Sequence, residues 1–443
     1  MNSGIEKLKN SLGQKLYHKA KNIIPGGTQL LSKRPEMFAP NIWPSYYSYA
    51  KGCEVWDMEN NKYIDMSIMG IGSNILGYAD SDVDLAVTEA IKHGVSSSLN
   101  CYEEVELAEL LVEIHPWSEM VRFTRSGGEA CSVAVRIARA FTNREKVMFS
   151  GYHGWADWYL AANLGDNDAL DGQLMPGLDP AGIPRGLKDS AIPFHFNNID
   201  ELKNKAKGFE KEIAAIIVEP ARGEDAPKNY LIALKEYAEK IGAVLIFDEI
   251  TSGFRMCNGG IHLNYGINPD LAVFAKSMAN GYAMAAIIGC EKVMSSAQSS
   301  FISSTNWTER IGPVASIATI KKFMTYNVSE HIITIGNAVK GVWDRAAKKN
   351  GLKINITGLP SLAAFSFENK YNQELMTFFT IEMLLKGFLG FRQFKPSFAH
   401  KMKDVEKYEV AVNEVFKKIN YTPIDQLLDS PVAHIGLHRL TKE

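Results

Sequence analysis

The chain has 443 residues, of which 46% are hydrophobic and 22% charged, as is ordinary for a globular protein of two or three domains. Its 48 Lys and Arg and 50 Asp and Glu residues give a net charge of −2, which favours a small-molecule partner over nucleic acid. No apolar run approaches the roughly 18 residues of a membrane span, and the N-terminus lacks a signal-peptide pattern, so we expect a cytoplasmic protein with no membrane partner.

The cysteines are odd in number and scattered, with no C-x-x-C pair. This usage favours buried free thiols in a reducing compartment, and a zinc site is not expected. The residues concerned are Cys53, Cys101, Cys131, Cys257 and Cys290.

The N-terminal part is expected to form an arm, a loop and a hairpin. Apolar residues at helical spacing predict a helix over Ile5–Ile24, which Pro25-Gly26-Gly27 ends. The stretch Thr28–Tyr49 is rich in Pro, Trp and Tyr and is typical of a packed loop. Glu54–Asp57 and Lys62–Asp65 flank an Asn-rich turn, which indicates a β-hairpin.

Beyond Ser67, predicted helices alternate with short buried strands. The predicted helices include Glu104–His115 and Ala130–Thr142, and the predicted strands are Lys146–Ser150, Ala214–Val218, Ala243–Asp248, Leu271–Ala275 and Ala285–Gly289. This alternation predicts an α/β fold with a mostly parallel sheet, whose ligands bind at the carboxyl ends of the strands. From about Pro313 the pattern becomes helical and then mixed, which predicts a smaller α+β domain. The expected domains are residues 1–66, the arm and hairpin that join the small domain, 67–312, the large ligand-binding domain, and 313–443, the C-terminal small domain.

Lys276 stands at the end of the apolar run Leu271–Ala275, just before a polar turn. Such a lysine can simply extend its ammonium group to the surface. Alternatively, it can form a Schiff base with a carbonyl cofactor, where desolvation makes the amine nucleophilic. The residue alone leaves both interpretations open.

Ser126-Gly127-Gly128-Glu129 follows a short predicted strand and opens a helix. Free N–H groups and the positive end of the helix dipole would face an anion such as phosphate. A capping box of Ser126 and Glu129 explains the same residues without a ligand. By contrast, Gly70-Ile71-Gly72 lacks the third glycine of a dinucleotide fingerprint.

Asp248 and Glu249 end the most hydrophobic predicted strand. A buried carboxylate requires a cation, which a ligand nitrogen or a metal could supply. A Walker-B aspartate is disfavoured because the chain has no G-x-x-x-x-G-K-[ST] loop. Asp248 and Lys276 are about one β-α-β step apart, so both can emerge at one sheet edge.

Gly151-Tyr152-His153-Gly154-Trp155 follows another predicted strand at the same edge. An aromatic side chain there could stack on a flat ring, although a packed aromatic turn is the more frequent case. No second histidine lies at metal-ligand spacing from His153. A phosphate cradle, an aromatic platform, an acid and a lysine together predict pyridoxal 5'-phosphate (PLP), whose ring nitrogen the acid would keep protonated.

The order of these motifs resembles the class III (subgroup II) aminotransferases of fold type I, and among them proteins similar to glutamate-1-semialdehyde 2,1-aminomutase. The matching stretches are Pro25-Gly26-Gly27, Tyr63-Ile64-Asp65, Ile75-Leu76-Gly77-Tyr78, Ser126-Gly127-Gly128-Glu129-Ala130, Tyr152-His153-Gly154, Glu219-Pro220, Asp248-Glu249, Gly253-Phe254-Arg255, Pro269-Asp270-Leu271 and Lys276, with Ser397-Phe398-Ala399-His400 near the C-terminus. The resemblance implies a large PLP-binding domain with a mostly parallel sheet and a smaller α+β domain.

The resemblance also implies roles for individual residues. Lys276 would be the Schiff-base lysine and the proton shuttle, Asp248 would pair with the ring nitrogen, and Tyr152 would stack on the ring. The cofactor-binding set that it implies is Ser126, Gly127, Gly128, Tyr152, His153, Glu219, Asp248, Thr251, Lys276, Thr305 and Thr308, with no metal. Enzymes of this family are homodimers with shared sites, in which a threonine of the neighbouring chain contacts the phosphate.

Several positions depart from the family pattern. Ser252 replaces the usual threonine before Gly-Phe, and the segment before Pro313 offers both Thr305 and Thr308 for the phosphate contact. The loop after Pro25-Gly26-Gly27 differs from the gating loop of the aminomutase. Glu224 stands where some relatives keep a switch glutamate, and the candidates for its substrate-binding arginine are Arg34, placed first, Arg222 and Arg392.

The predicted activity is transamination from a donor such as glutamate to an aldehyde or ketone. Aromatic residues at Trp43–Tyr49, Trp155, Trp158 and Trp307 suit a sugar-like acceptor, although core or dimer-interface packing explains them equally well. Two alternatives remain: a 2,1-aminomutase that needs no external donor, and a PLP-binding protein that has lost turnover.

Overall fold

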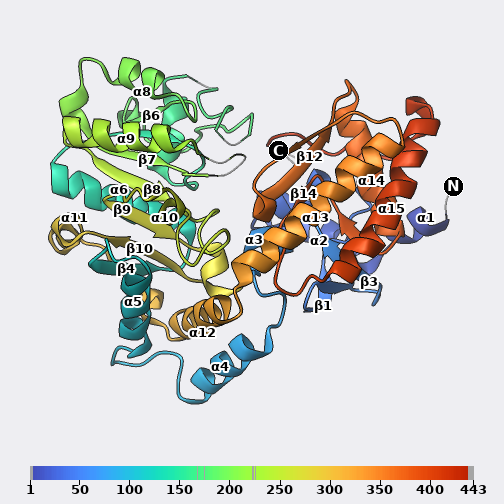
Figure 1. Ribbon diagram of the computed structural model, residues 1–443, viewed down its shortest axis with the longest axis horizontal. Coiled ribbons are helices and arrows are strands. Elements are labelled where there is room, and N and C mark those ends of the chain that lie inside the picture. Colours follow the sequence, from blue (N-terminus) through green and yellow to red (C-terminus); the bar gives the residue numbers. More distant parts are fainter. Residues whose placement is uncertain (1–2, 167, 174, 222–223, 225, 438–443) are drawn as a thin grey trace. The chain divides into compact units, whose positions relative to one another are not determined.

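The computed structural model describes residues 3–166, 168–173, 175–221, 224 and 226–437. The chain forms two compact units, one made of Met1–Asp80 with Glu330–Glu443 and the other of Ser81–Ser329 (Figure 1). Within the described residues, no helix combines the length and apolar character needed to cross a membrane.

A seven-stranded sheet forms the centre of the unit Ser81–Ser329, which we call the larger unit. Its strands, in spatial order, are β4 (Met120–Thr124), β10 (Ala285–Gly289), β9 (Leu271–Phe274), β8 (Val244–Asp248), β7 (Ile213–Val218), β5 (Lys146–Ser150) and β6 (Ala191–Pro193). β10 runs antiparallel to both of its neighbours, β4 and β9, whereas the other neighbouring strands pair in parallel. The prediction of a mostly parallel α/β sheet is therefore confirmed.

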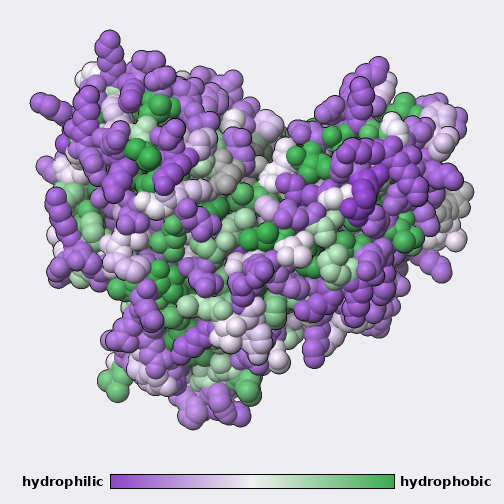
Figure 2. All heavy atoms as spheres, in the orientation of Figure 1, coloured by the Kyte–Doolittle hydropathy of each residue, from purple (hydrophilic) through white to green (hydrophobic). Residues whose placement is uncertain are grey.

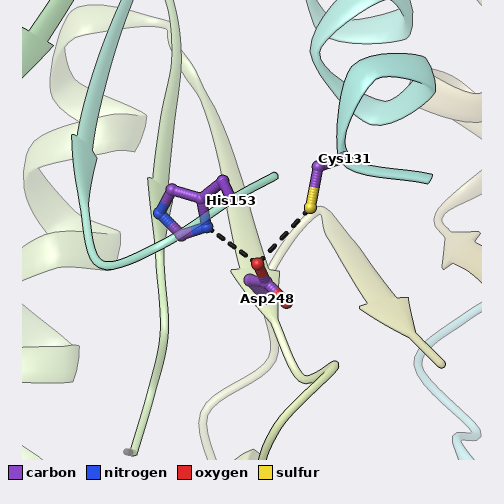
Figure 3. A group of neighbouring side chains, drawn as sticks. All are labelled: Cys131, His153 and Asp248. Carbon is purple, nitrogen blue, oxygen red and sulfur yellow. Dashed lines mark hydrogen bonds and ion pairs between the residues drawn. The ribbon is translucent and has the colours of Figure 1, made fainter. Parts of the chain in front are cut away.

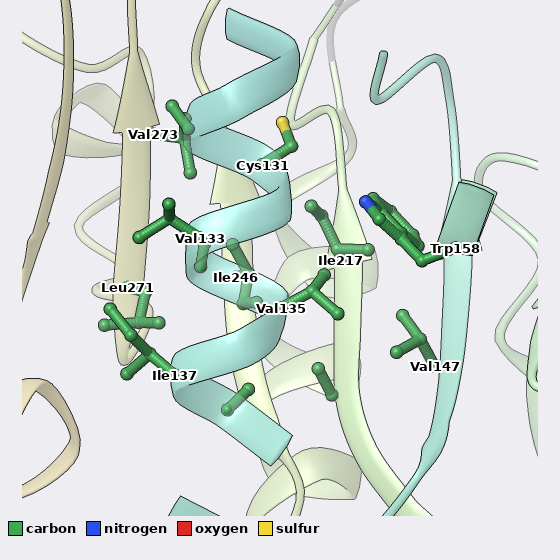
Figure 4. Packing of buried hydrophobic residues seen from close by; sticks show 14 of the residues in the cluster. Cys131, Val133, Val135, Ile137, Val147, Trp158, Ile217, Ile246, Leu271 and Val273 are labelled. Carbon is green, nitrogen blue, oxygen red and sulfur yellow. The ribbon is translucent and has the colours of Figure 1, made fainter. Parts of the chain in front are cut away.

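Helices cover both faces of this sheet because alternate strand residues point to opposite sides. Ile217 and Ile246 belong to the hydrophobic cluster around α6 (Gly127–Thr142), which Figure 4 shows lying along the strands. Ile216 and Leu245 belong to a second cluster with α9 (Lys228–Ile241). The remaining α-helices within this unit are α4 (Ser81–Lys92), α5 (Glu103–Ile114), α7 (Asp157–Leu160), α8 (Ile199–Ala206), α10 (His262–Tyr265), α11 (Glu291–Met294) and α12 (Ile311–Thr325). On the side drawn in Figure 2, hydrophilic side chains cover most of the surface around α8 and α9.

The unit Met1–Asp80 with Glu330–Glu443, which we call the smaller unit, contains two small sheets. One sheet has the order β1 (Tyr47–Lys51), β2 (Glu54–Asp57), β3 (Lys62–Met66) and β13 (Phe388–Gly390), and the other has the order β11 (Ile354–Thr357), β12 (Ala363–Phe367) and β14 (Gln393–Phe394). The predicted hairpin is confirmed as the antiparallel pair β2 and β3. A core around the fully buried Trp343 packs α13 (Val328–Lys349), α14 (Asn372–Leu385) and α15 (Met402–Tyr421) against the second sheet.

The predicted single helix Ile5–Ile24 is wrong, because the structure has two helices here. α1 (Ser3–Lys9) ends before Ser11, and α2 (Leu12–Ile23) begins after it. The Ser11 hydroxyl accepts the backbone N–H of Gln14, which makes Ser11 an N-cap and so starts a new helix.

Candidate active site

Asp248 ends β8 with a buried carboxylate, 2% exposed, that accepts three hydrogen bonds. Its Oδ2 lies 2.8 Å from Nδ1 of His153 and 3.4 Å from Sγ of Cys131 (Figure 3). Its Oδ1 accepts the backbone N–H of Ile250 at 3.0 Å. These donors offset the cost of burying the negative charge.

His153 lies between two oxygen acceptors. Nδ1 faces Asp248, and Nε2 lies 3.2 Å from the carbonyl oxygen of Ser150. With a proton on Nδ1, the ring donates a hydrogen bond to Asp248, a contact that the position of His153 after β5 did not specify.

The ligand atoms of Cys131, His153 and Asp248 lie within 4.8 Å of one another, a spacing at which such groups could hold a metal ion. Metal binding would require a thiolate. However, burial, followed by the negative charge of Asp248, raises the pKa of the Cys131 thiol well above its usual range. The thiol is therefore a hydrogen-bond donor to Asp248. That the site uses no metal stays a prediction.

Lys276 lies two residues after the end of β9, and its backbone is left-handed, with a φ of 41°. A side chain other than glycine seldom adopts this conformation, and such strain concentrates at functional sites. The ammonium nitrogen donates to Oγ1 of Thr251 at 2.9 Å. Because β8 and β9 are parallel neighbours, Asp248 and Lys276 follow adjacent strands at the same edge of the sheet, as their spacing predicted.

The N-terminus of α6 contains the predicted capping box. The Ser126 hydroxyl accepts the N–H of Glu129, and the Glu129 carboxylate accepts the N–H of Ser126 at 2.9 Å. The box leaves the N–H groups of Gly127 and Gly128, at the first two helical positions, without an intrahelical acceptor. The structural and the phosphate-binding interpretations of this motif are therefore compatible.

Other segments of the chain approach the glycines after Ser126 closely. A Cβ atom on Gly127 would stand 2.7 Å from Cδ1 of Ile250. Gly154 has a φ of 106°, and a Cβ atom on it would stand 2.8 Å from Cα of Gly128. The loop after β5 therefore packs on the N-terminus of α6 backbone to backbone.

Tyr152 and Glu219 are joined by a hydrogen bond, in which the Tyr152 N–H donates to Oε2 of Glu219 at 3.0 Å. The Tyr152 ring meets Tyr159 edge to face, with 5.9 Å between centroids. Glu219 directly follows β7, so it shares the sheet edge of Asp248 and Lys276.

Thr305 and Thr308 lie on an exposed 3-10 helix, Thr305–Thr308. Three arginines bind the backbone on either side of it. Arg125 donates to the carbonyl oxygen of Glu309 at 2.7 Å, Arg136 donates to that of Phe301 at 3.1 Å, and Arg122 donates to that of Ile302. The segment is therefore fastened to β4 and to α6, the helix that begins with Gly127 and Gly128.

The predicted substrate residues have varied surroundings. Arg34, in the smaller unit, packs its guanidinium on Gly26, where a Cβ atom would meet Nη2 at 2.2 Å. Arg392 lies over the Phe391 ring, and burial lowers the pKa of its guanidinium. Glu224 is exposed, and Arg222 lies outside the described residues.

The aromatic residues expected to line an acceptor site fall into two groups. Trp43 is buried and stacks on Phe38, with 4.3 Å between centroids, and Trp158 is buried in the cluster around α6. Trp155 is 70% exposed, and Tyr47 and Tyr49 are also exposed. Trp43 and Trp158 are thus core residues, whereas the rings of Trp155, Tyr47 and Tyr49 are accessible at the surface.

Cys131 and the partners of Glu249 were not identified from the sequence. The Glu249 carboxylate accepts the backbone N–H of His262 at 3.0 Å and its Nδ1–H at 2.8 Å, and it also accepts the hydroxyl of Ser252. Trp117 donates to Nε2 of His262 at 3.0 Å, so that nitrogen carries no proton. Burial raises the pKa of Glu249, but the hydrogen bonds from His262 and Ser252 lower it below its usual range. Nothing in local sequence signals these pairings.

Several of the matching motifs lie in the smaller unit and brace it. The Tyr78 hydroxyl donates to Oδ2 of Asp65 at 2.6 Å, and Nε2 of His400 donates to the carbonyl oxygen of Asp65 at 2.9 Å. Gly70 and Ile71 form a left-handed turn with φ values of 64° and 65°. Among the described residues, these motifs join segments of the smaller unit rather than presenting the reacting groups.

The chain has the fold of PLP-dependent transferases. Residues 39–394 match the family model described as Aminotransferase class-III, and the chain belongs to that family.

Two curated relatives are similar over most of the chain. The chain is 33% identical over 371 residues to a 3-aminobutyryl-CoA aminotransferase of Cloacimonas acidaminovorans, covering 82% of this chain and 85% of that protein. It is 32% identical over 436 residues to a glutamate-1-semialdehyde 2,1-aminomutase of Thermodesulfovibrio yellowstonii, covering 93% and 100%. The solved FumI protein of Sphingopyxis sp. MTA144 superposes with a TM-score of 0.84 at 24% identity, covering 94% of this chain and 99% of that one.

PLP is the cofactor of this family, and the residues present fit it. Asp248 offers an anion to a protonated ring nitrogen, and Lys276 offers an amine to the aldehyde. The two glycines offer backbone N–H groups and a helix dipole to the phosphate. The class of enzyme predicted from the sequence, a PLP-dependent class III aminotransferase, is confirmed.

Proposed function

We propose that the protein transfers an amino group from glutamate to an aldehyde or ketone, with Lys276 and Asp248 as its principal catalytic residues. The main support is the placement of these two side chains after adjacent parallel strands, one on a strained backbone and the other in a triad of hydrogen bonds. PLP supplies the electron-accepting ring when it is bound.

We assign separate roles to the residues expected to surround the cofactor. Lys276 would hold the cofactor covalently and then move a proton, and Thr251 would hold the amine of Lys276 in place. Asp248 would keep a proton on the ring nitrogen, Tyr152 would stack on the ring, and Glu219 would orient Tyr152 through its backbone N–H. Ser126, Gly127 and Gly128 would bind the phosphate, while His153 would support Asp248.

Substrate binding is assigned to Arg34 and Glu224. A donor carboxylate requires a guanidinium fork, and we place Arg34 first for that role. Glu224 would release or occupy that arginine as substrates alternate. For the acceptor we propose a sugar-like aldehyde, supported by the exposed ring of Trp155.

The first test compares wild-type protein with Lys276→Ala. Wild type should lose its visible PLP absorbance on adding glutamate and release 2-oxoglutarate in equal amount. The variant should hold PLP only noncovalently, so that dialysis removes it, and should release no 2-oxoglutarate. A covalently bound chromophore in the variant would contradict the role of Lys276.

The second test compares sugar aldehydes and simple keto acids as amino acceptors. A separate assay offers 3-aminobutyryl-CoA as the amino donor, because the name of a curated relative includes this compound. The proposal expects sugar aldehydes to be turned over with the highest kcat/KM. Turnover restricted to keto acids would rule out the sugar-like acceptor.

A 2,1-aminomutase is the second candidate, supported by the 32% identity to the enzyme of Thermodesulfovibrio yellowstonii. Such an enzyme isomerises a single substrate and needs no external donor. Steady release of 2-oxoglutarate from glutamate during multiple turnovers favours the transaminase. Conversion of glutamate-1-semialdehyde without any donor favours the mutase.

We also propose a cytoplasmic homodimer with shared sites. The proposal is supported by the very exposed apolar side chains Leu99, Tyr102, Val105 and Phe301, since large exposed apolar groups commonly mark protein interfaces. In such a dimer, Thr305 or Thr308 of one chain would reach the phosphate bound by the other.

A further inference from the structure

Cys131 lies on α6 with a fully buried thiol that is directed at Asp248 (Figure 3). We propose that Cys131 is a positioning residue for the cofactor: its S–H donates to Asp248 and, together with His153, fixes the carboxylate in the orientation that receives the ring nitrogen of PLP. This inference rests on the role of Asp248 under the proposed function.

The hydrogen bonds around Asp248 are unevenly divided. Oδ2 accepts from both His153 and Cys131, whereas Oδ1 accepts only the N–H of Ile250 among the described residues. A carboxylate has about two lone-pair positions on each oxygen. Oδ2 is therefore saturated, and the remaining position for a proton donor is on Oδ1. Without the thiol, both oxygens would have a free position, and the carboxylate could present either of them.

The thiol is suited to this task because it remains protonated. Burial and the adjacent negative charge of Asp248 raise the pKa of Cys131 well above its usual range, and the positive charge of Lys276 opposes them only in part. The group therefore stays an S–H donor over the working pH range. An anion at Cys131 would repel Asp248 instead.

The position of Cys131 on α6 also connects the two ends of the cofactor site. Gly127 and Gly128 form the first residues of the helix, and Cys131 follows about one turn later. One helix, α6, therefore carries both the glycines proposed to bind the phosphate and the Cys131 thiol, which donates to Asp248. The distance between these two features is set by the helix itself, not by a loop.

A packing role is the rival explanation, because Cys131 also belongs to the hydrophobic cluster that includes Val133 and Val273 (Figure 4). The two explanations differ in what can replace the thiol. Serine keeps a donor of similar size, whereas valine fills the space without a donor. Packing alone would favour valine, and hydrogen bonding would favour serine.

The test compares Cys131→Ser, Cys131→Val and Cys131→Ala with wild type as holoenzymes. The dissociation constant of PLP would be measured from the loss of visible absorbance on dilution, and the same absorbance would be titrated with pH. Cys131→Ser should match wild type within a factor of about two, since it keeps the donor. Cys131→Val and Cys131→Ala should weaken PLP binding about fivefold and shift the pH midpoint of the absorbance, as expected for the loss of one hydrogen bond.

Cys53 supplies a matched control. It is a buried thiol that lies 3.9 Å from a carboxylate, Oδ2 of Asp404, within the smaller unit. Cys53→Val should leave PLP affinity and the pH midpoint unchanged, even if it lowers thermal stability. Wild-type affinity in Cys131→Val, or a loss in Cys131→Ser as large as in Cys131→Val, would overturn the inference. If wild-type protein holds no PLP, the proposed function fails instead.

Discussion

Asp248 and Glu249 are adjacent in sequence, yet their side chains form hydrogen bonds with different sets of residues. Asp248 is proposed to accept the ring nitrogen of the cofactor at Oδ1, while Glu249 is enclosed by Ser252 and His262. Glu249 thereby closes the loop that carries Thr251, the partner of Lys276. The proposed cofactor-binding carboxylate and a carboxylate that only braces a loop are thus neighbours in sequence.

His115 extends this buried network and should make stability depend on pH. Nδ1 donates to the carbonyl oxygen of Leu111 at 2.9 Å, and Nε2 accepts the N–H of Gly260 at 3.0 Å, so the neutral ring satisfies both partners. Burial lowers the pKa of His115 to about 4, from an ordinary value of 6.5. Between these values the unfolded chain binds more protons, so stability falls as the pH falls from about 6.5 towards 4.

We therefore expect His115→Gln to flatten the pH dependence of stability. The amide can donate to Leu111 and accept from Gly260 without taking up a proton. The loss of unfolding free energy between pH 7 and 4.5 should shrink by up to roughly 3 kcal/mol relative to wild type, measured by urea unfolding. His93→Gln, at an exposed histidine, is the control and should leave the slope unchanged. Equal slopes for all three proteins would disprove the assignment to His115.

At the scale of elements, the loop after β5 depends on close backbone contact with α6. Gly154 has a positive φ, and the nearest atom to an added Cβ would be Cα of Gly128 at 2.8 Å. Because both partners are backbone, the clash cannot be relieved by rotating a side chain. A substitution there should displace the N–H groups proposed to bind phosphate.

Gly154→Ala should therefore weaken PLP binding by about tenfold or more, because misplaced N–H donors and a strained φ each cost on the order of 1 kcal/mol. The measurement is the PLP dissociation constant. Gly186→Ala is the control, since a Cβ atom there meets no atom within 4 Å and the backbone has no positive φ. It should bind PLP as wild type does. Tight binding by Gly154→Ala would show that the cradle tolerates displacement.

At the scale of the whole molecule, the exposed 3-10 helix Thr305–Thr308 allows the proposed dimer with shared sites to be tested. Arg122, Arg125 and Arg136 bind the backbone beside this helix. Co-expressed Lys276→Ala and Thr308→Val chains should then recover activity. One site of each mixed dimer would combine an intact lysine with the intact threonine of the other chain.

The same experiment with Thr305→Val identifies the threonine that serves the phosphate. Recovery is expected only for the threonine whose single variant is itself impaired. Sedimentation should show a dimer in every case. Activity no higher than that of the separate variants, with mixed dimers present, would contradict shared sites.

The sequence alone determined the family, the cofactor class and the order of the sheet-edge motifs. Those features are local: an apolar run followed by Lys276, one followed by Asp248, and Gly127-Gly128 at a helix start. The strand and helix patterns show which residues lie at the carboxyl ends of the strands, and this requires no knowledge of contacts with distant parts of the chain. The same local logic failed at Ser11, where a cap interrupts a continuous apolar pattern.

Only the tertiary structure decided what surrounds Asp248. Cys131 and His153 are 117 and 95 residues away along the chain, and Glu249 meets His262 across a loop. Hydrogen bonds act over about 3 Å, so they depend on how α6 and the loop after β5 lie against the end of β8 rather than on any spacing in sequence. Packing thus distinguished two neighbouring carboxylates that the sequence presented as a pair.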